Sequence, residues 1–485
     1  MAHYPRIASL GSAAKLRERL DELGLRLPVD DEAAAGGTSP LAQSLELGAG
    51  RVIGNRFVVQ PMEGWDGTAD GEPSELTVRR WRNFGRSGAA WIWGGEAVAV
   101  RRDGRANPNQ LVLSEATAGS IASLRLELMQ AALDAGFPEP LVGLQLTHSG
   151  RWSRPEAGRA APRIAFRHPL LDARAGIADD SAVLSDAEVD DLVACFARAA
   201  RLAQEAGFEF VDLKHCHGYL LHEFLAARRR SGRFGGPALH ERTRLLHLAI
   251  DAIRSAAPGL RIGVRLSVFD GVPHRAAGVD EGGHLGEGRP EPHTLPYDSG
   301  FGLDPSDPRR IQLDEANALV AELCARGVDW INVTAGSPYY VPHLQRPAAF
   351  PPSDGYAPPE DPLCGVARLL IAAREVKRAV PRAIVVSSGW SYLQEYIPHV
   401  AQACVRDGWF DAVGLGRMML AYPELPADVL AGRRLERRRL CRTFSDCTTA
   451  PRQGMVSGCY PLDPFYRARP EREQLEAAKR SRVPA

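Results

Sequence analysis

The chain has 485 residues, of which 59 are basic and 59 are acidic, and this balance argues against nucleic acid or an anionic membrane surface as a partner. No apolar run approaches the roughly 20 residues of a membrane helix, and the N-terminal residues lack the apolar core of a signal peptide. Five of the eight cysteines lie singly in helix-like or strand-like segments, which favours a reducing cytoplasm over a disulfide framework.

From Asn55 onwards, short apolar runs alternate with longer segments of helical spacing, after an N-terminal helix-like segment at Ala13–Leu23. The predicted strands are Phe57–Met62, Ala89–Val100, Leu141–Thr147, Phe208–Lys214, Arg261–Ser267, Trp330–Thr334, Ala383–Ser388 and Asp411–Gly414. The predicted helices are Leu76–Arg86, Ile121–Ala135, Asp186–Ala206, Glu241–Ala256, Leu313–Arg326, Pro362–Val380 and Leu393–Arg406. This order predicts an α/β fold of the TIM (β/α)8 barrel type.

Two segments stand outside the repeat. Residues 270–311, after the fifth run, are rich in Gly, Pro and His, and a loop of this length is usually a functional lid or a disordered insertion. In a barrel it would lie over the C-terminal mouth. The other segment starts near Leu435 and carries three cysteines. We therefore predict an N-terminal extension over 1–50, a barrel over 51–434 and a cysteine-containing tail over 435–485.

The most informative segment is FEFVDLKHCHGYLLHEFL, residues 208–225. Its apolar run ends in Lys214, two imidazoles and the phenol of Tyr219, which are groups that hold a planar polar ligand and pass a proton to it. Strand alternation puts Asp212 on the same face as Lys214, so a neutralising ion pair is the structural alternative. His215 falls on the opposite face and suits a structural role.

Taken in order, the strand ends resemble the old yellow enzyme family of FMN-dependent NADH:flavin oxidoreductases. The matching pieces are Asn55-Arg56-Phe57 through Pro61-Met62, Gly95-Glu96-Ala97, Gln145 to Arg151, His217 to Leu220, Gly235-Gly236 with Glu241-Arg242, Val264 to Ser267, and Gly414 to Arg417. The tail extends the likeness towards the bacterial branch that contains 2,4-dienoyl-CoA reductase and trimethylamine dehydrogenase. We do not expect the additional C-terminal nucleotide-binding domains of those relatives, because the chain stops too early.

The resemblance implies an FMN site at the C-terminal ends of the strands, where a flavin needs a phosphate anchor, hydrogen bonds to its pyrimidine edge and positive charge near N1. The implied residues are Ser388, Gly389, Gly416 and Arg417 for the phosphate, Gln145 and Arg265 for the pyrimidine and N1 edge, and Pro61, Met62 and Ala97 along the isoalloxazine. Structural alternatives remain: a packing turn at Gly416, a solvated amide at Gln145 and a salt bridge at Arg265.

Two positions depart from the family pattern. Many members hold the substrate carbonyl oxygen with a His-x-x-His or His-x-x-Asn pair; here Lys214 takes the first place, His217 keeps the second, and Tyr219 is the implied proton donor. A lysine can donate to a developing enolate or favour a carboxylate-bearing substrate. Glu63 stands where relatives have Thr or Cys near the flavin C4 oxygen. A carboxylate there would repel the reduced flavin unless it is protonated or turned away.

The tail cysteines Cys441, Cys447 and Cys459 stand where larger relatives bind a [4Fe–4S] cluster through four cysteines. The interval of eleven residues before Cys459 is kept, but one cysteine is missing and Phe444 stands near its place. Iron–sulfur clusters normally take four thiolates, and a three-cysteine zinc site with a fourth ligand is another option. We favour a vestigial or altered site over a bound cluster.

We expect a cytoplasmic, homo-oligomeric enzyme in which NAD(P)H, through FMN, drives reduction of an α,β-unsaturated carbonyl alkene by hydride transfer from flavin N5. Lys214 and His217 would stabilise the enolate and Tyr219 would protonate the α-carbon. The alternatives are oxidation of an amine or ring with electrons passed to an acceptor, and a non-redox lyase or aldolase with Lys214 as Schiff-base nucleophile. Two tyrosines at Tyr339-Tyr340, with His343, suit a flat or aromatic small-molecule substrate, and a packed loop is the structural alternative.

Overall fold

The computed structural model describes residues 4–48, 50–278 and 285–480, and its largest sheet is parallel and closed. The strands follow the order β4-β3-β15-β14-β13-β8-β7-β6-β5, and β4 also pairs with β6. Their bounds are β3 Phe57–Val59, β4 Trp91–Ile92, β5 Ala97–Ala99, β6 Leu141–Thr147, β7 Phe210–His215, β8 Arg261–Ser267, β13 Trp330–Thr334, β14 Ile384–Ser387 and β15 Ala412–Leu415. The predicted TIM barrel is confirmed.

The second predicted strand is divided into β4 and β5, which pair with successive parts of β6. The break falls at Gly95, whose φ of +48° lies in the left-handed region. A Cβ at Gly95 would lie 2.6 Å from the Trp81 ring. Since only glycine tolerates both the backbone angle and this close approach, the run Ala89–Val100 cannot continue as one strand.

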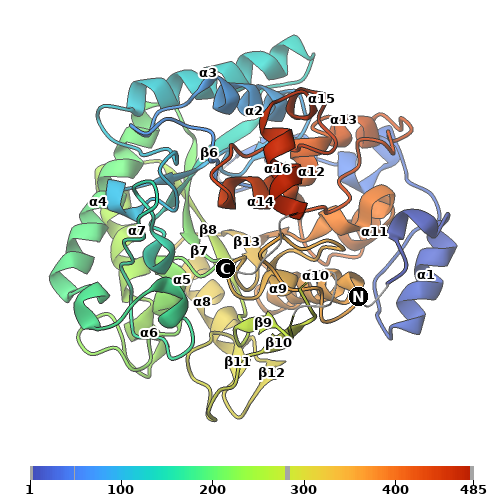
Figure 1. The fold of residues 1–485 in the computed structure, drawn as a ribbon. Helices are drawn as coiled ribbons and strands as arrows, with labels where there is room; N and C mark the ends of the chain where they lie inside the picture. The colour runs from blue at the N-terminus through green and yellow to red at the C-terminus, as the bar shows by residue number, and fades with distance from the viewer. Residues whose placement is uncertain (1–3, 49, 279–284, 481–485) are drawn as a thin grey trace.

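Helices ring the strands (Figure 1). Those of the repeat are α2 Glu75–Gly85, α3 Ala118–Asp134, α4 Asp186–Glu205, α7 Arg244–Ala256, α8 Asp314–Ala325, α10 Pro362–Ala379 and α11 Ile397–Arg406. Capping explains several ends: Ser74 begins α2, and Ser185 with Glu188 forms a capping box at the start of α4. The last predicted helix starts at Ile397 instead of Leu393, because Gln394 has a φ of +51°.

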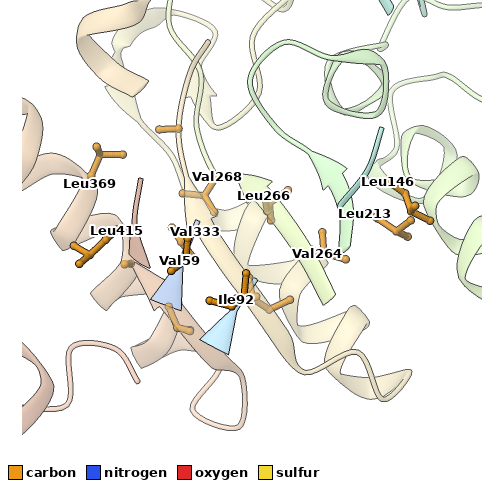
Figure 2. Packing of buried hydrophobic residues seen from close by; sticks show 14 of the residues in the cluster. Val59, Ile92, Leu146, Leu213, Val264, Leu266, Val268, Val333, Leu369 and Leu415 are labelled. Atoms are coloured by element: carbon orange, nitrogen blue, oxygen red, sulfur yellow. The ribbon is translucent and has the colours of Figure 1, made fainter. Parts of the chain in front are cut away.

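Alternate residues of each strand face two different cores. Phe57 and Val59 belong to the layer between strands and helices, and Figure 2 shows Val264, Leu266 and Val333 in the same layer. Val58 points into the barrel. There it joins an aromatic plug at the base, whose rings are Trp91, Trp93, Phe210 and Trp330.

A small hairpin of β1 (Leu45–Glu46) and β2 (Val52–Ile53) closes the base of the barrel, and α1 (Ala13–Glu22) precedes it in the chain. Leu45 and Ile53 pack on the aromatic plug, and Trp330 Nε1 donates a hydrogen bond of 3.0 Å to the Leu47 carbonyl. The hairpin therefore seals the end of the barrel opposite to the strand C-termini.

The long loop after β8 forms two antiparallel hairpins within its described part. One pairs β9 (His274–Ala276) with β10 (Gly288–Pro290), and the other pairs β11 (Leu303–Asp304) with β12 (Asp307–Ile311). Residues 279–284 of the predicted loop lie outside the described residues. The short helices of the remaining loops are α5 Leu220–Leu225, α6 Leu239–Arg242, α9 Pro342–Gln345, α12 Met418–Ala421 and α13 Leu425–Leu430.

The tail folds back onto the strand C-termini as α14 (Asp446–Arg452), α15 (Pro464–Arg467) and α16 (Glu471–Arg480), drawn in red in Figure 1. Ser457 Oγ accepts from the Trp65 amide at 3.2 Å, in the loop after β3. Thr449 Oγ1 accepts from the Ser353 amide at 3.1 Å, in the loop after β13. The tail thus bridges two loops of the mouth. Among the described helices, none has the length and apolarity needed to cross a bilayer.

The aromatic plug should dominate the stability of the barrel base. Trp91 is fully buried, with its ring centroid 4.8 Å from that of Trp93 and 5.0 Å from that of Trp330. We expect Trp91→Ala to lower the free energy of unfolding by about 3–5 kcal/mol, because it leaves a large cavity. Urea denaturation measures this, with Leu126→Ala, at a side chain 61% exposed, as the control. A loss below about 1 kcal/mol would show that the plug repacks around the gap.

Candidate functional site

A cavity of about 960 Å³ opens at the C-terminal ends of the barrel strands. Residues of the long loop, such as His274 and Arg275, and residues of the tail, such as Arg452, line its sides. Of the residues predicted from sequence for cofactor or substrate, twelve line it: Pro61, Met62, Glu63, Gln145, Lys214, His217, Tyr219, Arg265, Ser388, Gly389, Gly416 and Arg417. The barrel thus brings together side chains more than 350 residues apart in sequence, since 417 − 61 = 356.

Ala97 is the exception among the predicted residues. It is fully buried in β5 and is absent from the cavity wall. Its carbonyl accepts a hydrogen bond of 2.8 Å from Gln110 Nε2, so the loop after β5 covers it. The break at Gly95, which divides the second predicted strand into β4 and β5, explains why Ala97 lies behind the cavity wall.

A strained turn after β7 sets the direction of His217 and Tyr219. His217 has a φ of +65° and Gly218 a φ of +75°. Ser267 Oγ accepts from the His217 amide at 3.1 Å, and His222 Nδ1 accepts from the Gly218 amide at 2.8 Å. A left-handed histidine costs about 1–3 kcal/mol. These bonds hold the strained backbone and point both side chains into the cavity.

Lys214 forms its ion pair with Glu63, and not with Asp212, which strand alternation offered as the structural alternative. Its Nζ lies 3.7 Å from Glu63 Oε2. Asp212 is already engaged, because its carboxylate accepts from Gln145 Nε2 at 2.5 Å and from the Arg265 amide at 2.6 Å. Because the neighbouring strands already supply hydrogen-bond donors to Asp212, Lys214 pairs instead with Glu63, which lies in the loop after β3.

Glu63 also receives a hydrogen bond from the Tyr219 hydroxyl at its Oε2. Its other oxygen accepts from Asn107 Nδ2 at 3.3 Å. Lys214 Nζ lies 3.7 Å from the centroid of the Tyr219 ring, so cation, phenol and carboxylate form one compact cluster. Asn107 was not foreseen from sequence, because it comes from a loop without any motif.

Burial controls the protonation of these groups. It lowers the pKa of Lys214, against the opposing charge of Glu63, and lowers the pKa of His217 well below its usual range. Burial, together with the charge of Glu63, raises the pKa of Tyr219 well above 10. At neutral pH the site therefore offers a neutral imidazole and a protonated phenol.

Aromatic rings form one wall of the cavity. The Tyr219 hydroxyl lies 3.0 Å from the Tyr339 hydroxyl, and the Tyr339 ring stacks on Trp152 with centroids 4.5 Å apart and an interplanar angle of 9°. Tyr340, by contrast, turns away and donates to Asp270 Oδ2 at 2.8 Å, while His343 Nδ1 lies 2.7 Å from the Tyr356 hydroxyl. Trp152 directly follows the Gln145–Arg151 motif and gave no signal of its own in the sequence.

The cavity is strongly basic although the chain as a whole is neutral. Among its described lining residues the cations are Arg80, Arg154, Arg174, Lys214, Arg265, Arg275, Arg346, Arg417 and Arg452, against Glu63, Glu291 and Asp354. Burial and the charges of Arg452 and Arg417 lower the pKa of Arg346 to about 9. Such a surplus of positive charge suits an anionic ligand.

Four of these arginines, Arg80, Arg265, Arg346 and Arg417, have a buried nitrogen without a hydrogen-bond partner among the described residues. Two of them, Arg265 and Arg417, are residues predicted from sequence to hold the cofactor. Arg265 donates from Nη1 to the Pro61 carbonyl at 3.2 Å, and its Nε is unpaired. Arg417 donates from Nη2 to the Pro347 carbonyl at 3.0 Å, and its Nη1 is unpaired. Since buried guanidinium groups are rarely left unsatisfied, both nitrogens indicate places for ligand acceptors.

The tail cysteines lie beside this mouth. Cys441 and Cys459 are buried, and burial raises the pKa of both thiols, while Cys447 lines the cavity. Within the described residues, no group of three or more His, Cys, Asp or Glu side chains is arranged to hold a metal ion.

The model of the NADH:flavin oxidoreductase / NADH oxidase family matches residues 41–287, just over half of the chain. An NADPH dehydrogenase of Geobacillus sp. (strain WCH70) is 31% identical over 232 residues, which are 46% of this chain and 61% of that relative. The chain therefore spans less than two thirds of this curated relative.

Solved structures share the fold at lower identity. A 2-naphthoyl-CoA reductase complex matches with a TM-score of 0.62 and 17% identity, covering 88% of this chain and 57% of that one. Morphinone reductase matches with a TM-score of 0.53 and 19% identity, covering 83% of this chain and 92% of that one.

The Asp270–Tyr340 bond, which fixes the loop that carries Tyr339, should make stability depend on pH. Burial raises the pKa of Asp270 to about 7 from 3.8. The folded state then holds a proton that the unfolded state has lost, so this contribution is full below about pH 4 and is lost as pH rises through about 7. We expect the unfolding free energy of the wild type, relative to Asp270→Asn, to fall by up to about 1.4 kcal/mol per pH unit in this window.

Urea denaturation from pH 4 to pH 8 tests this expectation. The control is Asp134→Asn, at an exposed helix end, which should follow the wild type throughout. Parallel curves for the wild type and Asp270→Asn would contradict the raised pKa.

Proposed function

Because the chain belongs to the NADH:flavin oxidoreductase / NADH oxidase family, we propose that it is an FMN-dependent oxidoreductase that uses NAD(P)H to reduce an α,β-unsaturated carbonyl alkene. The observation that carries this proposal is the meeting of Lys214, His217 and Tyr219 with Arg265 and Arg417 in one cavity. One set of groups suits an electron-rich substrate oxygen and a proton transfer, and the other suits an anionic planar cofactor.

The residues present fit a flavin. Arg417, with its unpaired Nη1, would hold the phosphate beside Gly416, Gly389 and Ser388. Arg265, with its unpaired Nε, would meet the N1 edge, and Gln145, whose amide is oriented by Asp212, would meet the pyrimidine. Pro61 and Met62 would line the ring. When bound, FMN supplies a carrier that takes two electrons from NAD(P)H and passes them to the substrate.

The chain's own groups would then act on the substrate. The neutral imidazole of His217 and the cation of Lys214 would bind the carbonyl oxygen and stabilise the negative charge that develops there. The protonated Tyr219 would supply the proton to the α-carbon. The stacked rings of Trp152 and Tyr339 and the basic lining support a flat, aromatic or carboxylate-bearing small molecule. A homo-oligomeric state and a cytoplasmic location belong to the same proposal.

Oxidation of an amine or ring is a second candidate. Glu63 supports it, because a carboxylate among aromatic side chains attracts a cationic substrate. The lowered pKa of Lys214 would also suit a Schiff-base nucleophile, but family membership favours redox chemistry over a lyase or aldolase.

The first experiment is to incubate the purified protein with FMN, remove free flavin and record its absorption spectrum. Anaerobic bleaching by NADH or NADPH, followed by recovery of colour with 2-cyclohexenone, would support alkene reduction. Bleaching by an amine instead would favour oxidation. Protein that stays colourless after incubation with FMN would overturn the proposal.

Arg417 should distinguish FMN from its phosphate-free form, riboflavin. A charge-assisted hydrogen bond is worth about 1.5–3 kcal/mol, so Arg417→Met should weaken FMN binding by roughly 10-fold to 100-fold and leave riboflavin binding unchanged. Quenching of flavin fluorescence measures both affinities, with the exposed Arg434→Met as the control. An equal loss for the two flavins would place Arg417 against the ring.

Tyr219→Phe should slow only the substrate half of the reaction. Loss of a positioned proton donor costs about 10²-fold to 10⁴-fold, so recovery of flavin colour by 2-cyclohexenone should slow by that factor. Bleaching by NAD(P)H should keep its rate. Stopped-flow absorbance follows the two halves separately, with Tyr396→Phe, outside the cavity, as the control. Equal loss in both halves would assign Tyr219 a structural role.

A further inference from the structure

Arg346 and Arg417 are neighbouring cations of the cavity, and neither forms an ion pair with a carboxylate among the described residues. Arg346, which directly follows α9, donates from Nη1 to Thr448 Oγ1, and its buried Nη2 is unpaired. Arg417 donates to the carbonyl of Pro347, the residue after Arg346, and its Nη1 is unpaired. We propose that Arg346 and Arg417 form a two-arginine site for a phosphate group, and that the tail positions Arg346.

The charges that act on Arg346 are mostly of its own sign. Burial and the positive charges of Arg452 and Arg417 lower the pKa of Arg346 to about 9. The opposing influences come from Cys447 and Asp354, and Asp354 already pairs with Arg452 at 2.6 Å. Because a buried cation is costly without a counter-ion, an anion bound here would relieve the repulsion between these arginines.

The unpaired nitrogens and the number of charges fit a dianion. Arg346 Nη2 and Arg417 Nη1 can each donate a charge-assisted hydrogen bond, and guanidinium groups match the oxygens of carboxylate and phosphate. A carboxylate carries one negative charge and would neutralise only one of the two arginines. A phosphate monoester carries about −1.5 to −2 at neutral pH and has three oxygens that accept. The pair therefore favours phosphate over carboxylate.

The tail holds the segment that carries Arg346. Besides the bond between Thr448 and Arg346, Thr443 Oγ1 accepts from the Ala349 amide at 3.0 Å. Thr443 has a φ of +53°, which is a strained conformation for a β-branched residue and persists only where surrounding contacts hold it. The orientation of Arg346 thus depends on the tail, and Thr448 is a positioning residue of the site.

Two molecules of the proposed reaction carry phosphate, namely FMN and NAD(P)H, and this choice of ligands rests on the proposed function. If FMN is the source, Arg346 adds a second donor to the phosphate that Arg417 would hold. If the dinucleotide is the source, the two arginines bind one of its phosphates instead. Both arginines line the cavity, so either molecule can reach them.

The first test uses inorganic phosphate and the full-length protein freed of flavin. Thermal unfolding is followed as sodium phosphate is titrated against sodium chloride of equal ionic strength, and the midpoints give a dissociation constant. Arg346→Met should bind phosphate about 10-fold to 100-fold more weakly than the wild type, because one charge-assisted hydrogen bond is lost. The control is Arg438→Met, at an exposed position outside the cavity.

The second test distinguishes the two sources of phosphate. If FMN is the source, Arg346→Met should weaken FMN binding by the same factor and leave riboflavin binding within twofold, as quenching of flavin fluorescence would show. If the dinucleotide is the source, FMN binding should stay unchanged. The NADPH concentration that gives half the maximal rate of flavin bleaching should then rise about 10-fold.

Two more variants keep the proposal testable if Arg346→Met folds poorly. Arg346→Lys keeps the charge but loses the planar fork, and should bind phosphate about 10-fold more weakly. Thr448→Val removes the hydroxyl that orients Arg346, so it should weaken phosphate binding and leave riboflavin binding unchanged. Thr294→Val, at an exposed position of the long loop, is the matched control.

The outcomes separate this site from the function beneath it. Equal phosphate affinity in the wild type and Arg346→Met, with unchanged binding of FMN and NADPH, would overturn the site. Equal loss of FMN and riboflavin binding would assign Arg346 a structural role and also overturn it. A protein that binds phosphate through Arg346 yet takes up no FMN would overturn the proposed function and leave the phosphate site standing.

Discussion

The site depends on one constraint, which is that charged groups buried at the rim of a closed barrel need partners of opposite charge or hydrogen-bonding partners. The register of the strands decides which groups are close enough to pair. Parallel pairing sets Gln145 beside Asp212, and Lys214 beside Arg265. Asp212 is saturated by Gln145 and by the Arg265 amide. Two neighbouring cations are then left without a carboxylate of their own strands. Arg265 is open to a ligand, and Lys214 must take its partner from the loop after β3.

This second pairing links several loops into one hydrogen-bonded and stacked chain. It runs from Asn107 through Glu63, Tyr219 and Tyr339 to Trp152. Every member comes from a different βα connection, so the acid strength of Tyr219, the charge of Lys214 and the flat wall of the cavity are coupled. The glutamate in place of the usual threonine or cysteine is turned towards the phenol. Tyr219 and Lys214 supply partners for this carboxylate within the protein.

Sequence was sufficient where structure is local. Leu141–Thr147, Arg261–Ser267 and Trp330–Thr334 were predicted with the observed bounds, because continuous apolar runs mark strands buried on both faces. The prediction of a barrel was also enough to predict that side chains at the C-terminal strand ends line one cavity. Ala97, however, lies behind the wall, and Arg346 and Arg452 reach the mouth only through loop and tail packing that has no local pattern. The partner of Lys214 could not be read from alternation, because alternation ignores the neighbouring strand.

Net charge proved a poor guide to the cavity for a physical reason. The chain balances 59 cations with 59 anions. Exposed carboxylates such as Asp31, Glu115 and Asp190 pair with arginines at the outer surface, whereas the cavity wall keeps an excess of cations. In a cleft with low-dielectric walls, such an excess focuses the field on a small ligand and is little screened by salt. The positive charge is therefore concentrated in the cavity, where it suits a small anionic ligand. Because Arg452 belongs to α14, the tail contributes to this charge directly.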